Sequence, residues 1–129
     1  MPNNDLSWLS RSELLIGPDG IDKLQKSHVL VVGLGGVGSF AAEFIARSGV
    51  GRMTIVDGDV VDPTNRNRQL PALATNHGVS KAQIMAERLL AINPALELTA
   101  IEQFLSPEEA KNLLETTKFD YVMDCIDSV

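Results

Sequence analysis

The stretch that decides the fold is His28-Val-Leu-Val-Val32 with Gly33-Leu-Gly-Gly-Val-Gly38 directly after it. The first five residues form a short apolar run rich in β-branched side chains, which is typical of a strand buried on both faces of a sheet. Residues 37–48 then read as a helix with Phe40, Phe44 and Ile45 on one side. A strand, a glycine loop and a helix in this order predict the first unit of an open α/β sheet.

The rest of the chain alternates in the same way. Residues 5–27 read as a helical segment interrupted by a turn at Gly17-Pro18-Asp19-Gly20. Further strands are expected at 52–56, 96–101 and 119–125, and helices at 81–92, after the N-cap Ser80, and from Ser106-Pro107 onward. The polar stretch from 58 to about 76 predicts a loop with short helical turns. Alternation of strand and helix predicts an α/β, Rossmann-like and mostly parallel sheet with helices on both faces.

Composition limits the classes of function. The chain has 129 residues, enough for one domain, with 44% hydrophobic and 22% charged residues. We expect no membrane association, because no apolar run approaches the roughly 20 residues that span a bilayer and no secretory signal opens the sequence. One cysteine excludes an internal disulfide and a multi-cysteine zinc site in this span. We therefore expect a cytoplasmic location, and the net charge of −6 argues against a nucleic-acid surface built from these residues alone.

The glycine loop has the pattern G-x-G-x-x-G in the context that gives it meaning, after a strand and before a helix. Small residues let the backbone approach a phosphate, and the helix N-terminus offers N–H donors. Asp57 ends the second strand, 19 residues after Gly38, where an acid can accept hydrogen bonds from both hydroxyls of a ribose. These features serve NAD and ATP equally.

The next loop separates the two nucleotides. Asn65-Arg66-Asn67-Arg68-Gln69 puts two guanidiniums and three amides just beyond the ribose position, and Lys81 begins the following helix. A hydride-transfer enzyme needs no such charge there, whereas an enzyme that cleaves ATP must neutralise the polyphosphate and the departing pyrophosphate. A solvated loop would explain one arginine, but the group together favours ATP.

Carboxylates at the end of the chain suggest a metal. Asp127 follows the fourth predicted strand, at the edge of the sheet where ligands of open α/β folds bind, and a carboxylate near phosphates most simply holds Mg²⁺. Asp124 is interpreted as structural. Cys125 falls in a predicted buried strand and is interpreted as an inert core residue.

Six segments together resemble one known family. They are Arg11-Ser-Glu-Leu-Leu-Ile-Gly17, the glycine loop, Asp57-Gly-Asp59, Asn65-Arg-Asn-Arg-Gln69, Gly78-Val-Ser-Lys81 and Ile92-Asn-Pro94. In this order they are similar to the ubiquitin-activating-like adenylyltransferases, the group that contains ThiF, MoeB and HesA. The resemblance covers nearly the whole chain and its motifs are highly specific.

The resemblance assigns roles by position. It implies that the backbone of Gly35, Gly36 and Gly38 contacts ATP phosphates, that Asp57 binds the ribose and that Asp59 assists metal or phosphate positioning. It implies that Asn65, Arg68 and Lys81 bind the polyphosphate and that Asp127 is the magnesium ligand. Arg11 would reach the ATP of a partner subunit, which implies a homodimer. The chemistry would be attack of a carboxylate on the α-phosphate, giving an acyl-adenylate and pyrophosphate.

Finer details look most like one branch, the tRNA threonylcarbamoyladenosine dehydratases. The matching details are the Arg11 to Gly17 start, Asn67-Arg-Gln69 followed by Leu70-Pro-Ala-Leu73, and the ending Asp124-Cys-Ile-Asp-Ser-Val129. This branch activates a carboxylate of a modified adenosine in tRNA and cyclises it with loss of water. The resemblance divides the chain into an N-terminal helical arm, 1–27, and the first part of a Rossmann-like ATP-binding domain, 28–129. We expect that domain to be incomplete and its bare sheet surface to be covered by further residues or partner chains.

Other readings stay open at this point. A second enzyme hypothesis is adenylation of the C-terminal glycine of a ubiquitin-like sulfur-carrier protein, which would make a sulfur-relay protein the partner instead of tRNA. A third is an NAD-dependent oxidoreductase. The non-enzymatic alternative is a module that only binds nucleotide or dimerises.

Overall fold

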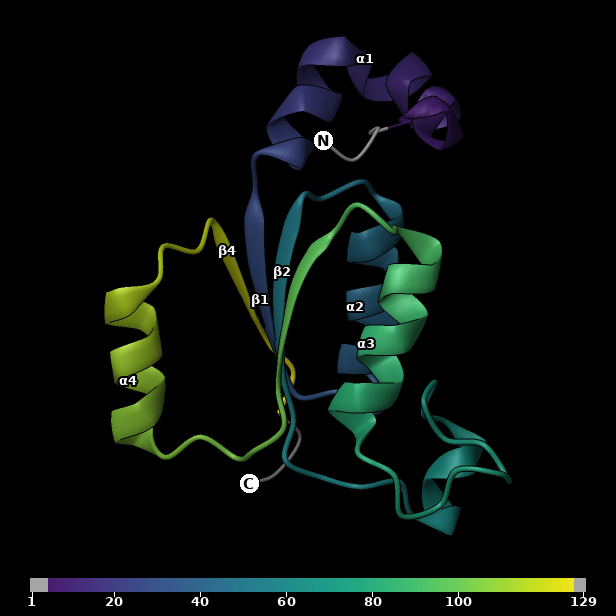
Figure 1. Cartoon of the computed structure of the whole chain (residues 1–129), viewed down its shortest axis with the longest axis vertical. Helices are drawn as coiled ribbons and strands as arrows, with labels where there is room; N and C mark the ends of the chain where they lie inside the picture. Colours follow the sequence, from purple (N-terminus) through teal and green to yellow (C-terminus); the bar gives the residue numbers. More distant parts are fainter. Residues whose placement is uncertain (1–4, 127–129) are drawn as a thin grey trace.

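A four-stranded parallel sheet forms the centre of the computed structural model, which describes residues 5–126 (Figure 1). The strands are β1 (His28–Val32), β2 (Arg52–Val56), β3 (Glu97–Ile101) and β4 (Tyr121–Asp124), in the order β3-β2-β1-β4. Leu30 of β1 pairs with Thr54 of β2 on one side and with Val122 of β4 on the other, so β1, the strand that precedes the glycine loop, is central. The predicted Rossmann-like α/β fold is confirmed.

Helices lie on both sides of this sheet, as predicted. The helical elements are η1 (Ser7–Leu9), α1 (Ser10–Gln25), α2 (Gly38–Arg47), η2 (Pro63–Asn67), α3 (Lys81–Ile92) and α4 (Pro107–Thr116). Helices α2 and α3 cover one face, α4 stands on the other, and α1 lies beyond the amino ends of the strands (Figure 1). None of the helices between residues 5 and 126 has the length and apolarity needed to cross a membrane.

The turn predicted inside the first helical segment is present as a kink in α1. Gly17 has a φ of 74° and a ψ of 170°, which is not helical, and Pro18 follows it. Because only glycine adopts such a positive φ at little cost, the two halves of α1 can change direction here. The two caps predicted from sequence also form: Ser80 accepts a hydrogen bond from the Gln83 N–H, and Ser106 accepts one from the Glu109 N–H.

The hydrophobic core lies between the sheet and the α2–α3 layer. It contains Val29 and Val31 of β1, Met53 and Ile55 of β2, and small or apolar residues of the two helices. The face of α2 that packs inward is made of Ala42 and Ala46, both completely buried. The predicted apolar side of this helix is therefore corrected: Phe40 is 41% exposed and Phe44 is 65% exposed. Alanines occupy the interface because α2 approaches the sheet too closely for an aromatic ring.

The close approach of α2 is visible at its first residue. A Cβ atom added to Gly38 would lie 1.6 Å from the carbonyl oxygen of Gly33, whereas one added to Gly36 would lie 3.8 Å from the nearest atom, Arg68 Cγ. Gly38 is thus required for packing of the helix on the loop, and Gly36 is not. The edge strand β4 is exposed along its whole length, as expected of a sheet edge with nothing packed on it.

We predict that Gly38→Ala lowers the free energy of unfolding by at least about 3 kcal/mol, because the new methyl group collides with backbone atoms that cannot move aside. Gly36→Ala is the matched control and should change it by less than about 1 kcal/mol. Urea denaturation of the two variants measures both values. Equal stability of the two variants would contradict this account of the loop.

Candidate functional site

A cleft of about 730 Å³ opens at the carboxyl ends of the strands. This volume is within the usual range for a small-molecule site. Polar groups of the loops line one part of the cleft, and apolar side chains of the sheet and α4 line the other. The lining residues include Gly35, Asp57, Asp59, Asn65, Arg68, Gln69, Lys81, Phe104, Leu113 and Asp124.

The glycine loop contributes main-chain donors. Gly33 turns the chain out of β1 with a φ of 93°, and its N–H still donates to the carbonyl of Val56 at 2.8 Å. Helix α2 begins after Val37, and no side chain caps its N-terminus. Within residues 5–126 the first N–H groups of α2 therefore have no side-chain acceptor, which is the arrangement that binds an anion.

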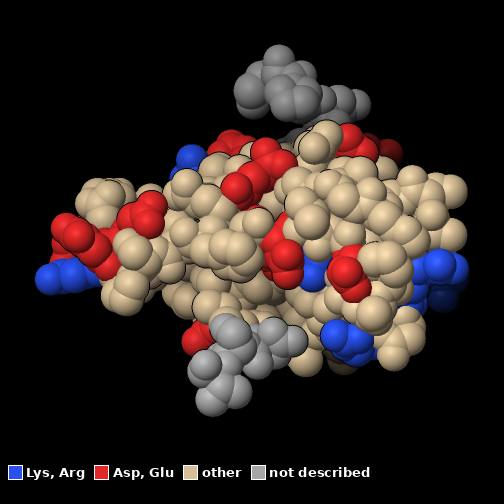
Figure 2. All heavy atoms as spheres, turned by 90° about the horizontal axis from the view of Figure 1, so that it is seen from below, with Lys and Arg blue, Asp and Glu red and all other residues tan. Residues whose placement is uncertain are grey.

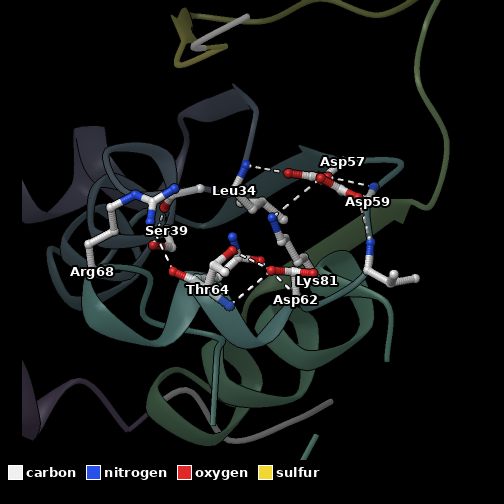
Figure 3. A network of polar contacts seen from close by, with 11 residues as sticks. Leu34, Ser39, Asp57, Asp59, Asp62, Thr64, Arg68 and Lys81 are labelled. Carbon is white, nitrogen blue, oxygen red and sulfur yellow. Dashed lines mark hydrogen bonds and ion pairs between the residues drawn. The ribbon is translucent and has the colours of Figure 1, made fainter. Parts of the chain in front are cut away.

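Asp57 ties this loop to the end of β2. Its Oδ2 accepts a hydrogen bond from the Leu34 N–H at 2.7 Å, and its Oδ1 accepts one from the Asp59 N–H at 2.7 Å (Figure 3). One carboxylate thus fixes the glycine loop and the turn after β2 relative to each other. Because each carboxylate oxygen has a second lone pair, Asp57 can still accept hydrogen bonds from ligand hydroxyl groups.

The predicted polar segment 65–69 begins in η2, and three of its five residues, Asn65, Arg68 and Gln69, line the cleft. Asp62 accepts from the Thr64 N–H at 2.9 Å, and Asn65 Oδ1 accepts from the Asp62 N–H at 2.9 Å, which together form a capping box. The Asn65 side chain is buried and lines the cleft, and Nδ2 is the donor group that the capping box does not use. Its conformation is therefore set before any ligand arrives.

The two arginines of this loop differ in position. Arg68 lines the cleft, and its Nη1 donates to the Thr64 carbonyl at 3.1 Å and to Asn67 Oδ1 at 2.9 Å (Figure 3). Arg66 is exposed and does not line the cleft. Only Arg68 is placed to meet a phosphate in the cleft.

Lys81 supplies a second cation from the opposite side. Its side chain is only 5% exposed, and its Nζ lies 3.5 Å from Asp59 Oδ2. Figure 3 shows the lysine side chain pointing from α3 toward Asp57 and Asp59. A buried ammonium group needs an anionic partner, so this lysine is ready to pair with a ligand anion as well as with Asp59.

Other predicted residues lie elsewhere. Arg11 is exposed in the first turn of α1. This helix lies beyond the amino ends of the strands (Figure 1), whereas the cleft of the same chain opens at their carboxyl ends. Gly36 and Gly38 are not part of the cleft lining, although Gly35 is. Asp127 lies outside the described residues. Among the residues that are described, no three His, Cys, Asp or Glu side chains gather to hold a metal.

The structure also places in the cleft two residues to which no individual site role was assigned from sequence. Asp124, interpreted above as structural, ends β4 and lines the cleft, and so does Gln69. The apolar part, which includes Phe104 and Leu113, comes from the segment between β3 and β4. The sequence gives little indication of these contacts, because the parallel sheet order brings β4 beside β1 only in three dimensions.

The single cysteine lies in surroundings that disfavour its thiolate form. Cys125 directly follows β4 and packs against the core. Burial, with a smaller contribution from the neighbouring Asp124 carboxylate, raises the pKa of its thiol, so the thiolate is disfavoured. The predicted inert role is supported, although the residue lies just past the strand and is only half-buried.

Comparison with known proteins decides the family. Residues 9–129 match the family model described as the ThiF family. The chain belongs to the ThiF family. Among its curated relatives is the tRNA threonylcarbamoyladenosine dehydratase of Bacillus subtilis, 47% identical over 124 residues, which cover 96% of this chain and 48% of that protein. The sulfur carrier protein ThiS adenylyltransferase of Escherichia coli is 37% identical over all of this chain and 51% of its own length.

A solved ThiF-family structure shows the same fold. The Escherichia coli tRNA N6-threonylcarbamoyladenosine dehydratase TcdA, in complex with ATP, aligns with a TM-score of 0.89 at 41% identity and covers 97% of this chain and 52% of that chain. The chain thus spans about half the length of the ThiF relatives it matches.

We predict that Asp59→Asn lowers the free energy of unfolding by about 1–2 kcal/mol, because it leaves the buried Lys81 ammonium without its partner. Inorganic pyrophosphate should then raise the melting temperature of the variant more than that of the wild type. Glu97→Gln is the control: it removes the exposed ion pair with Arg52 and should cost about 0–1 kcal/mol. If pyrophosphate raised the melting temperatures of Asp59→Asn and of the wild type equally, the assignment of an anion site at Lys81 would be contradicted.

Proposed function

We propose that the protein containing this chain is an ATP-dependent tRNA threonylcarbamoyladenosine dehydratase. The observation that carries the proposal is one cleft lined by Arg68, Lys81, Asp57 and Gly35 of the glycine loop. Two cationic side chains beside a glycine loop that leads into a helix N-terminus suit a triphosphate. The 47% identity to a relative of that name supports this choice of reaction.

The residues of the chain bind and orient the reactants. In this proposal the ribose hydroxyls bind Asp57, the phosphates lie between the glycine loop and Arg68, and Lys81 and Asn65 Nδ2 donate to phosphate oxygens. A carboxylate oxygen of the modified adenosine attacks the α-phosphorus, the bond to the bridging oxygen breaks, and pyrophosphate leaves with the electron pair. A nucleophilic atom within the modified part of the adenosine then bonds to the adenylated carboxyl carbon, loses its proton and displaces AMP. The modified base therefore loses one water overall.

Fixed charge provides most of the catalysis in this scheme. Arg68 and Lys81 stabilise the charge that moves onto the leaving pyrophosphate, and no general base is needed for attack by a carboxylate that is already ionised. The apolar half of the cleft, between the sheet and α4, offers a dry surface to the adenine base.

Magnesium fits the acidic lining of this cleft. Mg²⁺ is usually held by one or two carboxylates together with substrate phosphates, so three protein ligands are not required. Asp124 and Asp59 line the cleft, and we propose that they, with Asp127, would hold the ion. Bound there, it would neutralise phosphate charge.

Two further features belong to the proposal. Arg11 cannot serve the cleft of its own chain from its place on α1, which supports a homodimer in which it reaches the site of the partner. Seen from the side at which the strands end, the molecule has acidic and basic side chains interspersed on its surface (Figure 2). With a net charge of −6, this chain is proposed to bind ATP and the modified nucleoside rather than a long stretch of tRNA backbone.

The alternative substrate is the C-terminal glycine of a ubiquitin-like sulfur carrier, supported by the 37% identity to a ThiS adenylyltransferase. ATP–pyrophosphate exchange separates the two. Exchange stimulated by tRNA bearing threonylcarbamoyladenosine, and not by a sulfur-carrier protein, is expected. Stimulation by the carrier alone would overturn the proposed reaction in favour of the alternative.

ATP binding by variants of the two neighbouring arginines tests the residues. We predict that Arg68→Ala weakens ATP binding by about 10- to 100-fold, because a charge-assisted hydrogen bond to phosphate is lost. Arg66→Ala, which removes the neighbouring guanidinium outside the cleft, should change ATP affinity by less than about threefold. Calorimetric titration with ATP measures both, and equal losses in the two variants would remove Arg68 from the site.

A further inference from the structure

The hydroxyl of Ser39 is completely buried at the start of α2 and makes two hydrogen bonds. Ser39 is 0% exposed. Its Oγ accepts from the Leu70 N–H at 3.3 Å and donates to the carbonyl of Gly35. Because an N–H can only donate and a carbonyl can only accept, the direction of both bonds is fixed. The hydroxyl therefore lies between the glycine loop and the turn after η2.

This hydroxyl is the polar connection between two parts of the cleft wall. Within residues 5–126, the bond from Leu70 is the only hydrogen bond that joins residues 33–47 to residues 63–72. The first segment contributes Gly35 to the cleft lining, and the second contributes Arg68. A Cβ atom added to Gly36 would still lie 3.8 Å from Arg68 Cγ, so the arginine stem lies beside the glycine loop without being pressed against it.

The position of Arg68 follows that of its own segment. Its Nη1 donates to the Thr64 carbonyl and to Asn67 Oδ1, and its N–H donates to the Asn65 carbonyl at 3.2 Å. All three acceptors belong to the same short segment as the arginine. The distance from the guanidinium to the glycine loop therefore depends on where the segment is attached, and the attachment is the Leu70 N–H, two residues further along the chain.

The second bond of the hydroxyl orients a peptide group of the glycine loop. The carbonyl of Gly35 accepts from the Ser39 N–H at 3.1 Å and also from the Ser39 hydroxyl. In a planar trans peptide the N–H of the next residue, Gly36, points in the opposite direction, which here is out of the amino end of α2. Within residues 5–126 this N–H donates to no acceptor. It is therefore available to an anion.

We propose that Ser39 is a positioning residue for ATP: its hydroxyl holds Arg68 and the glycine loop at the spacing that lets both bind the same polyphosphate. This inference rests on the proposed function, in which the polyphosphate lies between these two groups. Ser39 is buried and does not line the cleft, so it acts through its hydrogen-bond partners and not through contact with the nucleotide.

Ser39→Ala removes the hydroxyl, and Ser48→Ala is the matched control. Both serines belong to the α2 region and donate to a carbonyl of the preceding turn, Ser48 to Ile45 at 2.5 Å. Ser48 lies at the other end of the helix, and within residues 5–126 its hydroxyl joins no second segment. Ser39→Cys nearly keeps the volume and offers only a weak donor, so it carries the same comparison if Ser39→Ala does not fold.

The test is calorimetric titration with ATP and with adenosine, at a temperature at which melting curves show every variant to be folded. Ser39→Ala should weaken ATP binding by about tenfold and adenosine binding by less than about twofold, because only the phosphate contacts lose their spacing. Ser48→Ala should change either affinity by less than about twofold. In the Arg68→Ala background, Ser39→Ala should weaken ATP binding by no more than about threefold, since the group that it positions is absent.

A tenfold loss of ATP affinity from Ser39→Ala in both backgrounds would overturn the inference, because the serine would then act without the arginine. Equal losses for ATP and adenosine would assign Ser39 a structural role instead, and so would an unchanged affinity for ATP. Failure of the wild type to bind ATP would contradict the proposed function itself, so the two failures are distinguishable.

Discussion

The whole site depends on how closely the glycine loop packs against its surroundings. Gly38 allows α2 to start directly on the backbone of Gly33, and Asp57 holds the Leu34 N–H from the end of the neighbouring strand. These two contacts fix the amino end of α2 at the mouth of the sheet. The helix begins there without a side-chain cap, and Gly35 of the loop that leads into it lines the cleft, which is the arrangement by which glycine loops receive an anion.

Charged side chains complete this arrangement from both sides. Arg68 comes from the turn after η2, and Lys81 from the start of α3, and each is held by local acceptors in the absence of ligand. The cations are thus positioned before a nucleotide enters, which lowers the cost of ordering them on binding. The acidic residues Asp59 and Asp124 lie on the same lining, so the cleft combines cationic donors with carboxylates suited to a divalent ion.

Local sequence patterns predicted most of the fold. The strand-glycine-helix unit at 28–48, the caps at Ser80 and Ser106 and the kink at Gly17 all form where turn and cap chemistry indicates. The prediction was wrong about Phe40 and Phe44, since periodicity identifies an apolar side of a helix but not the closeness of its packing. In α2 the small side chains face the sheet, and the large ones remain exposed.

The candidate site was predictable where its residues follow the glycine loop and β2, because Asp57, Asn65, Arg68 and Lys81 belong to recognisable motifs. Asp124 was not, and Gln69 was named only as a member of its motif, with no role of its own. Asp124 joins the cleft only through the pairing of β4 with β1, which no local pattern encodes.

The central claim is that this cleft accepts a triphosphate nucleotide rather than a nicotinamide dinucleotide. Calorimetric titration of the protein with ATP and magnesium, and separately with NAD⁺, tests it most directly. The account predicts saturable heat with ATP and an affinity for NAD⁺ at least about 100-fold weaker. Clear binding of NAD⁺ with none of ATP would contradict it.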